Sequence, residues 1–386
     1  MRGVAVLIVS ALCLVLHANA ATAAAGCDKP GLDRAVAAVH QARADLLKLP
    51  IGDGTSTDET PAALRAIAAM KARLGDVVGA FLRCQAPGAD PKAVLAALTH
   101  LAGATGGDKD YRYGSSVSFE VRRAAPNLLT VTADFQIVCS GDTMLMIFAS
   151  DGGWHEVLRV QSQPYKEVSG AYAFFEYGIS PPDGAGRWFV VEKNILPWCS
   201  STWSEIHYAV LRPSGDPLKP RLLFEGKDPV WWGAEDEGLR VGQNDFTVHF
   251  HAESIDSGVH NRVWLRHFAV AGDRVTRVAP LAENARDFAE EWIQSDWKTM
   301  APWTARADLA GLQAKLHGIE FFEYASVRRC GQGRTQIELT PTPLPPARPD
   351  TQPYFLVVRG DKDFRLLDAA RTPDPDCKGP NLFTPQ

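Results

Sequence analysis

The chain has 386 residues, of which 46% are hydrophobic and 22% are charged, and its formal net charge is −5. These proportions are ordinary for a folded protein and exclude an intrinsically disordered chain. No cluster of lysine and arginine stands out, so we expect neither a nucleic-acid-binding surface nor a polybasic membrane patch. The length exceeds that of a usual single core and predicts two or three domains.

Residues 1–25 have the pattern of a cleaved signal peptide. Arg2 precedes an apolar run over residues 4–16, and small residues with the motif Ala18-Asn19-Ala20 follow it. The run is too short for a permanent membrane anchor, and no later segment is apolar enough for a transmembrane helix. We therefore predict export, with a periplasmic or secreted location. The style of the signal and the alanine-rich composition favour a bacterial source.

Six cysteines remain after the signal is removed, and an even number in an exported chain predicts disulfide bonds. They are Cys27, Cys84, Cys139, Cys199, Cys330 and Cys377. Two lie in each of three regions that differ in composition, so we predict that they pair in chain order. The chain has no CxxC motif, which argues against a zinc ribbon or a thioredoxin-type redox site. A lipoprotein signal ending at Cys27 is the alternative for the first cysteine.

Residues 26–105 are rich in alanine, and their apolar residues recur at helical spacing. Thr60 and Asp90 each precede a proline, as a capping residue does before the first helical position. We expect three helices, over 31–48, 61–84 and 91–102. If the first two run antiparallel, the end of the second returns to the start of the first, and the two cysteines of this region meet. We expect this module to be a structural cap or an interaction domain.

Residues 111–280 change to alternating apolar and polar residues with glycine-containing turns, a pattern that predicts antiparallel meanders. We identify three strand–strand–strand units, whose middle strands begin near Thr143, Ser204 and Arg262, about sixty residues apart. Such a repeat favours propeller-like units, although three units are too few for an ordinary closed propeller. A strand near 115–123 is a candidate contributor to a fourth unit, and a sandwich is the alternative architecture.

Cys139 and Cys199 precede the middle strands of the first two units at similar distances, which favours a bridge between neighbouring units. A nucleophilic role for Cys199 is the alternative. A catalytic cysteine needs a basic partner, and the nearest one, His207, lies inside an alternating strand. We therefore predict that Cys199 is half of a disulfide.

Residues 281–386 combine helices and strands. Helical patterns cover 282–301 and 306–316, and strand patterns cover 319–328, 334–340, 354–359 and 363–369. Two helices on a curved antiparallel sheet resemble the layout of cone-shaped NTF2-like domains, a likeness of fold that implies no function. The whole chain is thus expected to be a multi-domain α+β protein with a helical N-terminal module, a central antiparallel β module and a small C-terminal α+β module.

The segment FTVHFHAES, residues 246–254, is a candidate metal site. Strand alternation places His249, His251 and Glu253 on one face, and His260 or His267 would approach from the partner strand. Two histidines and a carboxylate are ligands that zinc and similar ions take in proteins.

The alternative is a polar sheet face without a metal. Arg262, Trp264 and Arg266 share a face of the following strand, where we expect them to stack and pair with the histidine and glutamate groups. Two nearby arginines would oppose a divalent cation. We therefore favour the polar face and predict neither a metal nor a cofactor.

Other signals of chemistry are weak. The chain lacks the GxSxG, HExxH, P-loop, dinucleotide-binding and EF-hand motifs, and we identify no catalytic residue. Asp108 and Asp110, or the acidic loop over 235–237, are candidate glycosidase carboxylates beside a sugar-stacking ring. Tryptophans in or near the β region either pack in its core or line a ligand groove. They are Trp188, Trp198, Trp203, Trp231, Trp232 and Trp264.

From these observations we expect a non-catalytic binding or interaction protein of the bacterial envelope. Its partner is unknown, with an envelope protein or a saccharide as the candidates. The alternative is a secreted hydrolase that acts on envelope polymers or saccharides, assisted by a metal if the histidine cluster binds one.

Overall fold

The computed structural model describes residues 27–50, 60–103, 112–138, 140–165, 170–196, 203–231, 238–256, 258–259, 261–342, 352–361 and 363–383. In this part of the chain the strands form four antiparallel sheets of four strands each, and helices lie at both ends. The chain is therefore a β-rich α+β protein, as expected. The predicted signal peptide lies outside the described residues.

Three helices form the N-terminal part, close to the predicted positions. They are α1 (Lys29–Leu46), α2 (Pro61–Arg83) and α3 (Pro91–Leu101). Each begins with a proline in its first turn, and the preceding Asp28, Thr60 or Asp90 accepts a hydrogen bond from a backbone N–H of that turn. Local capping chemistry thus determines where these helices start.

The predicted disulfides at the two ends of the chain are confirmed. Cys27 bonds to Cys84 with an S–S distance of 2.04 Å, because the antiparallel α1 and α2 return the chain to its start. Cys330 bonds to Cys377 and joins the last sheet to the C-terminal segment. Cys139 and Cys199 lie outside the described residues.

Sheet 1 is a meander of four strands in chain order: β1 (Val117–Ala125), β2 (Leu128–Ile137), β3 (Ser140–Ser150) and β4 (Trp154–Gln161). The strand expected near 115–123 is therefore the first strand of this sheet rather than part of a fourth unit. One face of sheet 1 packs against the helices in a shared apolar core that includes Met70, Leu74, Val131 and Phe148.

Sheets 2 and 3 repeat the same meander. Sheet 2 contains β5 (Ala173–Ile179), β6 (Val190–Ile195), β7 (Trp203–Arg212) and β8 (Arg221–Trp231). Sheet 3 contains β9 (Gly238–Val241), β10 (Asp245–Glu253), β11 (Asn261–Ala271) and β12 (Arg274–Arg277). The predicted units lack the first strand of each sheet. Four residues in β9 are too few to show a period, and a register shift between Ala173 and Glu176 interrupts β5.

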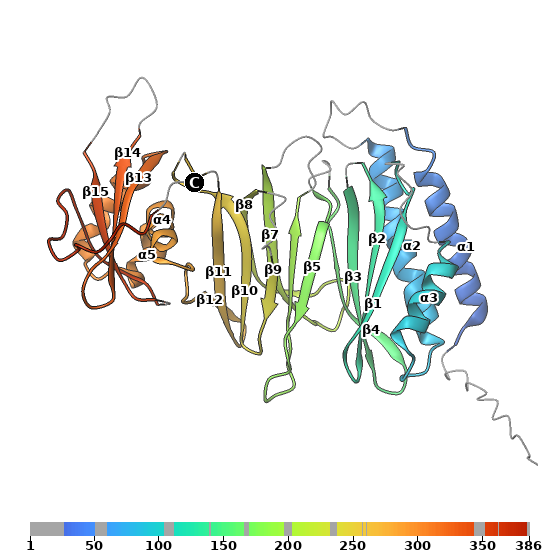
Figure 1. The fold of residues 1–386 in the computed structure, drawn as a ribbon. Helices are drawn as coiled ribbons and strands as arrows, with labels where there is room; N and C mark the ends of the chain where they lie inside the picture. Colours follow the sequence, from blue (N-terminus) through green and yellow to red (C-terminus); the bar gives the residue numbers. More distant parts are fainter. Residues whose placement is uncertain are drawn as a thin grey trace, which may run out of the picture.

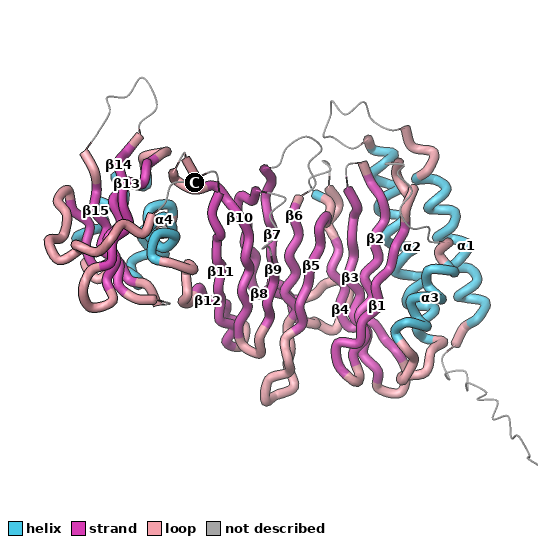
Figure 2. Tube along the Cα trace, viewed as in Figure 1, coloured by secondary structure: helices cyan, strands magenta, loops and turns pink. Residues whose placement is uncertain are grey.

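The helices and the first three sheets lie side by side in a row, as Figures 1 and 2 show. Separate apolar clusters fill the spaces between successive layers, one between sheets 1 and 2 and another between sheets 2 and 3. Sheet 2 is thus covered on both faces. On its central strand β6, Val190 packs toward sheet 1 and Val191 packs toward sheet 3, because successive side chains alternate between faces.

The C-terminal part places helices against the fourth sheet. The helices are α4 (Ala285–Gln294), α5 (Trp297–Met300) and α6 (Ala310–His317), and the strands are β13 (Phe322–Arg329), β14 (Arg334–Pro341), β15 (Tyr354–Arg359) and β16 (Arg365–Ala370). The single helix expected over 282–301 is wrong. It breaks at Ser295, whose backbone is extended, and Asp296 caps the start of α5 through the Thr299 N–H.

No helix in the described part of the chain has both the length and the apolar character that spanning a membrane would require.

Candidate functional site

The candidate metal residues share a face of β10 but do not converge. Buried and partly exposed residues alternate along the strand, with the histidines in the partly exposed set. His251 Nδ1 lies 2.9 Å from Asn261 Oδ1, and His249 Nδ1 lies 3.7 Å from Glu283 Oε1. Glu253 is exposed, and His260 lies outside the described residues. Within the described ranges, no three His, Cys, Asp or Glu side chains are grouped closely enough to hold a metal ion.

The expected pairing of these histidines with the arginines of β11 is wrong. The strand register places Phe250 opposite Trp264 and Val248 opposite Arg266. Residues that lie opposite each other share a face, so Arg266 points to the side of the sheet away from His249 and His251. The arginines of β11 therefore belong to the buried interior.

They form a buried ionic layer that sequence analysis missed. Arg266 pairs with Glu291 of α4 at 2.8 Å and with Asp228 of β8 at 2.7 Å, and Arg262 pairs with Glu290 at 2.9 Å. Burial alone would raise the pKa of Glu291, but Arg266, Arg277 and Arg262 outweigh it and lower that pKa to about 2. Every charge in the layer has a partner, so we assign it a structural role, joining sheets 2 and 3 to α4.

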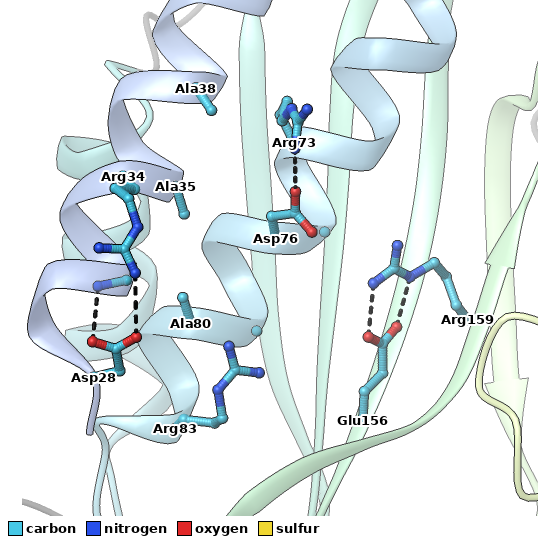
Figure 3. A pocket seen from close by; sticks show the side chains of 13 residues that line it. Asp28, Arg34, Ala35, Ala38, Arg73, Asp76, Ala80, Arg83, Glu156 and Arg159 are labelled. Atoms are coloured by element: carbon cyan, nitrogen blue, oxygen red, sulfur yellow. Dashed lines mark hydrogen bonds and ion pairs between the residues drawn. The ribbon is translucent and has the colours of Figure 1, made fainter. Parts of the chain in front are cut away.

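A polar groove of about 510 Å³ runs between α1, α2 and β4 (Figure 3). Small residues, including Gly75, form part of its wall. A Cβ at Gly75 would lie only 2.3 Å from a guanidinium nitrogen of Arg159, so this arginine rests directly against the backbone of α2. The Arg159 guanidinium in turn makes two hydrogen bonds of 2.7 Å to Glu156.

The charges of this groove mostly offset one another. Arg73 pairs with Asp76 at 2.9 Å, and Arg34 lies 3.6 Å from Asp28, which also caps α1. The four side chains of these two pairs are half exposed or more, so each pair contributes little to stability or affinity. The groove is therefore a seam between the helices and sheet 1 rather than the best candidate for a ligand site.

A second cavity, of about 710 Å³, lies between sheet 2 and the segments that leave β4 and enter β5. We call it the inter-sheet cavity. The loop between β7 and β8 closes one side, because Pro217 O accepts a hydrogen bond of 2.8 Å from the Arg159 N–H of β4. Tyr172 lines it from the residue just before β5, and Glu192, Ala209 and Glu225 line it from sheet 2.

The last three residues form one row across the sheet. Ala209 of β7 lies opposite Glu192 of β6 on one side and opposite Glu225 of β8 on the other. Neighbouring strands are about 4.8 Å apart, so the two carboxylates flank the small Ala209 side chain from positions about 10 Å apart in the backbone. This row leaves room above Ala209 between two acids.

Glu192 is the unusual residue of the row. It is 3% exposed, and Asn194 Nδ2 donates a hydrogen bond of 3.0 Å to its Oε2 atom. Burial raises the pKa of Glu192 to about 7, although the hydrogen bond from Asn194 lowers it in part. Burial and the nearby Glu192 carboxylate also raise the pKa of the Tyr172 hydroxyl. A buried carboxyl group with a raised pKa in a cavity is a usual mark of a functional site.

Sequence analysis did not single out Glu192, because it lies in the strand pattern of residues 187–195 as an ordinary polar position. Its burial results from the stacking of sheet 1 on sheet 2, and no local pattern reports that contact.

Some predicted tryptophan and acidic positions do meet elsewhere. Trp203, Trp231 and Glu253 line a pocket of about 500 Å³ together with Phe321. The neighbouring Trp232, the loop over 235–237, and Asp108 and Asp110 lie outside the described residues.

No protein-family model matches this chain, and no curated protein matches it in sequence. Among solved structures it is similar to the alpha-L-arabinofuranosidase ARB93A from Fusarium graminearum bound to an iminosugar inhibitor. That likeness has a TM-score of 0.26 and 10% identity, over 68% of this chain and 67% of the other. A GH93 alpha-L-arabinofuranosidase of Fusarium graminearum with arabinobiose gives a TM-score of 0.23 and 9% identity, over 61% and 62% of the two chains. At such TM-scores these likenesses support no conclusion about fold or function.

Proposed function

We propose that the chain is an exported, non-catalytic binding protein whose ligand occupies the inter-sheet cavity. The observation that carries this proposal is the burial of Glu192 in the cavity wall with one hydrogen bond from the protein. Moving an ionised carboxyl group out of water is unfavourable, and a single amide donor offsets that penalty only in part. A ligand that donates hydrogen bonds to it would remove that penalty.

The size and rim of the cavity support a small ligand. Its volume of about 710 Å³ falls in the range usual for small-molecule sites, roughly 300–1,000 Å³. Leu218 and Leu222 line the rim and are 57% and 50% exposed. Large apolar side chains exposed beside a buried polar group are what an amphipathic ligand would cover.

We also propose an architecture and a cellular location for this binding protein. Three stacked four-stranded meanders support a propeller-like, open arrangement between a helical module at 26–105 and an α+β module at 281–386. We propose that a signal peptide at 1–25 directs this chain to the periplasm or the outside of a bacterial cell. We also propose that Cys139 and Cys199 bridge sheets 1 and 2 within the β module at 111–280.

Filling the cavity tests the binding function. Neutral small-molecule fragments, screened against the mature chain by ligand-observed NMR, should give hits that compete for one site. Ala209→Phe should abolish them, because its ring would occupy the space between the two acids. The matched control is Ala38→Phe, which fills the groove of Figure 3 instead and should leave the hits unchanged. Hits lost in the control and kept in Ala209→Phe would contradict the proposal.

A second candidate function is acid–base hydrolysis of an envelope polymer or saccharide. It is favoured by the pKa of Glu192 near 7 and by Glu225 across the same cavity, because a general acid works best with a pKa near the working pH. Incubation with envelope polysaccharide should then release reducing ends, and Glu192→Gln should abolish the release. Binding of the polysaccharide without release of reducing ends would contradict hydrolysis and favour the binding function.

A further inference from the structure

Building on the proposed binding function, we infer that the ligand of the inter-sheet cavity is a cation, namely an ammonium group carried on an apolar body. The row formed by Glu192, Ala209 and Glu225 supplies the site for the ammonium group. The rim formed by Leu218 and Leu222 supplies the site for the apolar part.

The charge balance of the cavity points to a cation. Its basic side chains lie at the exposed rim, where water screens their charge and each has an acidic neighbour. Lys227 lies 3.2 Å from Glu205, His207 Nε2 lies 2.5 Å from the same carboxylate, and Lys219 lies 3.8 Å from Asp216. Glu192 and Glu225, in contrast, have no ion-pair partner among the described residues. Glu225 is exposed to solvent, so Glu192 is the buried carboxyl group of the cavity that no ion pair compensates within the described residues.

Hydrogen bonding at the same face of β6 points the same way. Glu192 receives one donor for its two oxygens, and Asn194 Oδ1 is fully buried without any donor within the described part of the chain. The buried face is thus short of donors. An ammonium group carries three N–H donors and no acceptor, so it would supply donors to Glu192, the residue of this face that lines the cavity.

The apolar rim excludes a bare inorganic cation as the best ligand. Leu218 and Leu222 are half exposed or more, and covering such side chains with an apolar chain is favourable because it removes apolar surface from water. A metal ion would leave them in water. Burial raises the pKa of Glu192 because no cation compensates it in the folded chain, which agrees with a site built for an incoming positive charge.

Calorimetric titration of the mature chain at about pH 8 tests the inference. The probes are hexylamine, hexanol and hexanoate, which share an apolar chain and differ in charge; hexylamine is protonated at this pH, as a lysine with a pKa of about 10.4 would be. Hexylamine should bind at one site, at least about tenfold more tightly than hexanol, and hexanoate should not bind. Glu192→Gln keeps the shape of the side chain and removes its charge, so it should weaken hexylamine at least about tenfold and leave hexanol nearly unchanged.

The control is Glu120→Gln, which makes the same change in net charge at an exposed position of β1. It should not alter the affinity for hexylamine. Equal affinity for hexylamine and hexanol would overturn the inference that the ligand is a cation, and so would an unchanged affinity for hexylamine in Glu192→Gln. Either result would still be compatible with a binding protein for a neutral ligand. Failure of hexylamine to bind would overturn the inference as well. Failure of the neutral fragments too would overturn the binding function itself.

Discussion

Three buried carboxyl groups show how the surroundings of a single residue set its state. Glu291 is surrounded by arginines, and its pKa falls to about 2 despite burial. Asp142 accepts hydrogen bonds from Ser162 and Tyr165 and pairs with Lys71 at 3.2 Å. Glu192 has one amide donor, and burial raises its pKa to about 7. The first two carboxylates have a cationic partner in the fold, whereas Glu192 has none among the described residues.

The raised pKa of Glu192 predicts a pH-dependent stability. Its folded pKa of about 7 exceeds the ordinary value of 4.5, so its contribution is fully present below pH 4.5 and is lost as the pH rises through about 7. Between pH 5 and pH 8, wild type should lose up to about 3 kcal/mol of unfolding free energy relative to Glu192→Gln. Urea unfolding at both pH values measures this. A difference between wild type and Glu192→Gln that is the same at both pH values would contradict this prediction.

The space beside Ala209 predicts that two alanines on central strands differ in how well they tolerate a larger side chain. Ala209 faces the inter-sheet cavity, whereas Ala133 of β2 is fully buried in the core between the helices and sheet 1. Ala209→Leu should change the unfolding free energy by less than about 1 kcal/mol, and Ala133→Leu should lower it by about 1–3 kcal/mol through overpacking. Chemical denaturation of both variants decides it. Equal losses would show that the space beside Ala209 is filled.

At the scale of elements, close contacts of individual side chains fix the position of α2 against sheet 1. On α2, Lys71 reaches the buried Asp142 of β3, and one turn later Gly75 admits the Arg159 side chain of β4. These contacts hold one face of α2 against sheet 1. Glycine in a helix is otherwise unfavourable by up to about 1 kcal/mol relative to alanine, so its presence at 75 reflects the space that Arg159 takes.

Two glycines on α2 provide a matched test. At Gly79 an added Cβ would meet Arg83 at 3.5 Å, an ordinary contact, whereas at Gly75 it would collide with the Arg159 guanidinium. Gly79→Ala should raise the unfolding free energy by about 0.5–1 kcal/mol. Gly75→Ala should be less stable than Gly79→Ala by at least about 1 kcal/mol, because Arg159 must leave Glu156. Thermal and urea unfolding measure both, and equal gains would refute the close approach.

At the scale of the whole molecule, ionic side chains connect layers that come from distant parts of the chain. Asp228 of sheet 2, Arg266 of sheet 3 and Glu291 of α4 meet in one buried layer. Their positions in the sequence are far apart, so the layer forms only when sheets 2 and 3 stack and α4 docks. It therefore ties the β sheets to the C-terminal part.

Removing the central charge of this layer should loosen that connection. Glu291→Gln removes the carboxylate that the buried Arg266 and Arg277 share and should lower the unfolding free energy by about 3 kcal/mol or more. Glu283→Gln, which changes a half-exposed carboxylate, should lower it by less than about 0.5 kcal/mol. Because the pKa of Glu291 is depressed to about 2, its contribution is present above pH 4.5 and is lost as the pH falls through about 2. A loss as small as that of the control would show that the layer contributes little.

The sequence by itself determined the features that local patterns encode. Thr60-Pro61 and Asp90-Pro91 marked the helix starts, alternation marked most strands, and chain order paired the cysteines at both ends. Only the tertiary structure decided the rest. A strand pattern assigns side chains to two faces but not to the neighbour each face meets, so it could not show that Arg266 turns away from His249 or that Glu192 is buried. Those outcomes depend on strand register and on the stacking of sheets, which are contacts between residues far apart in the chain.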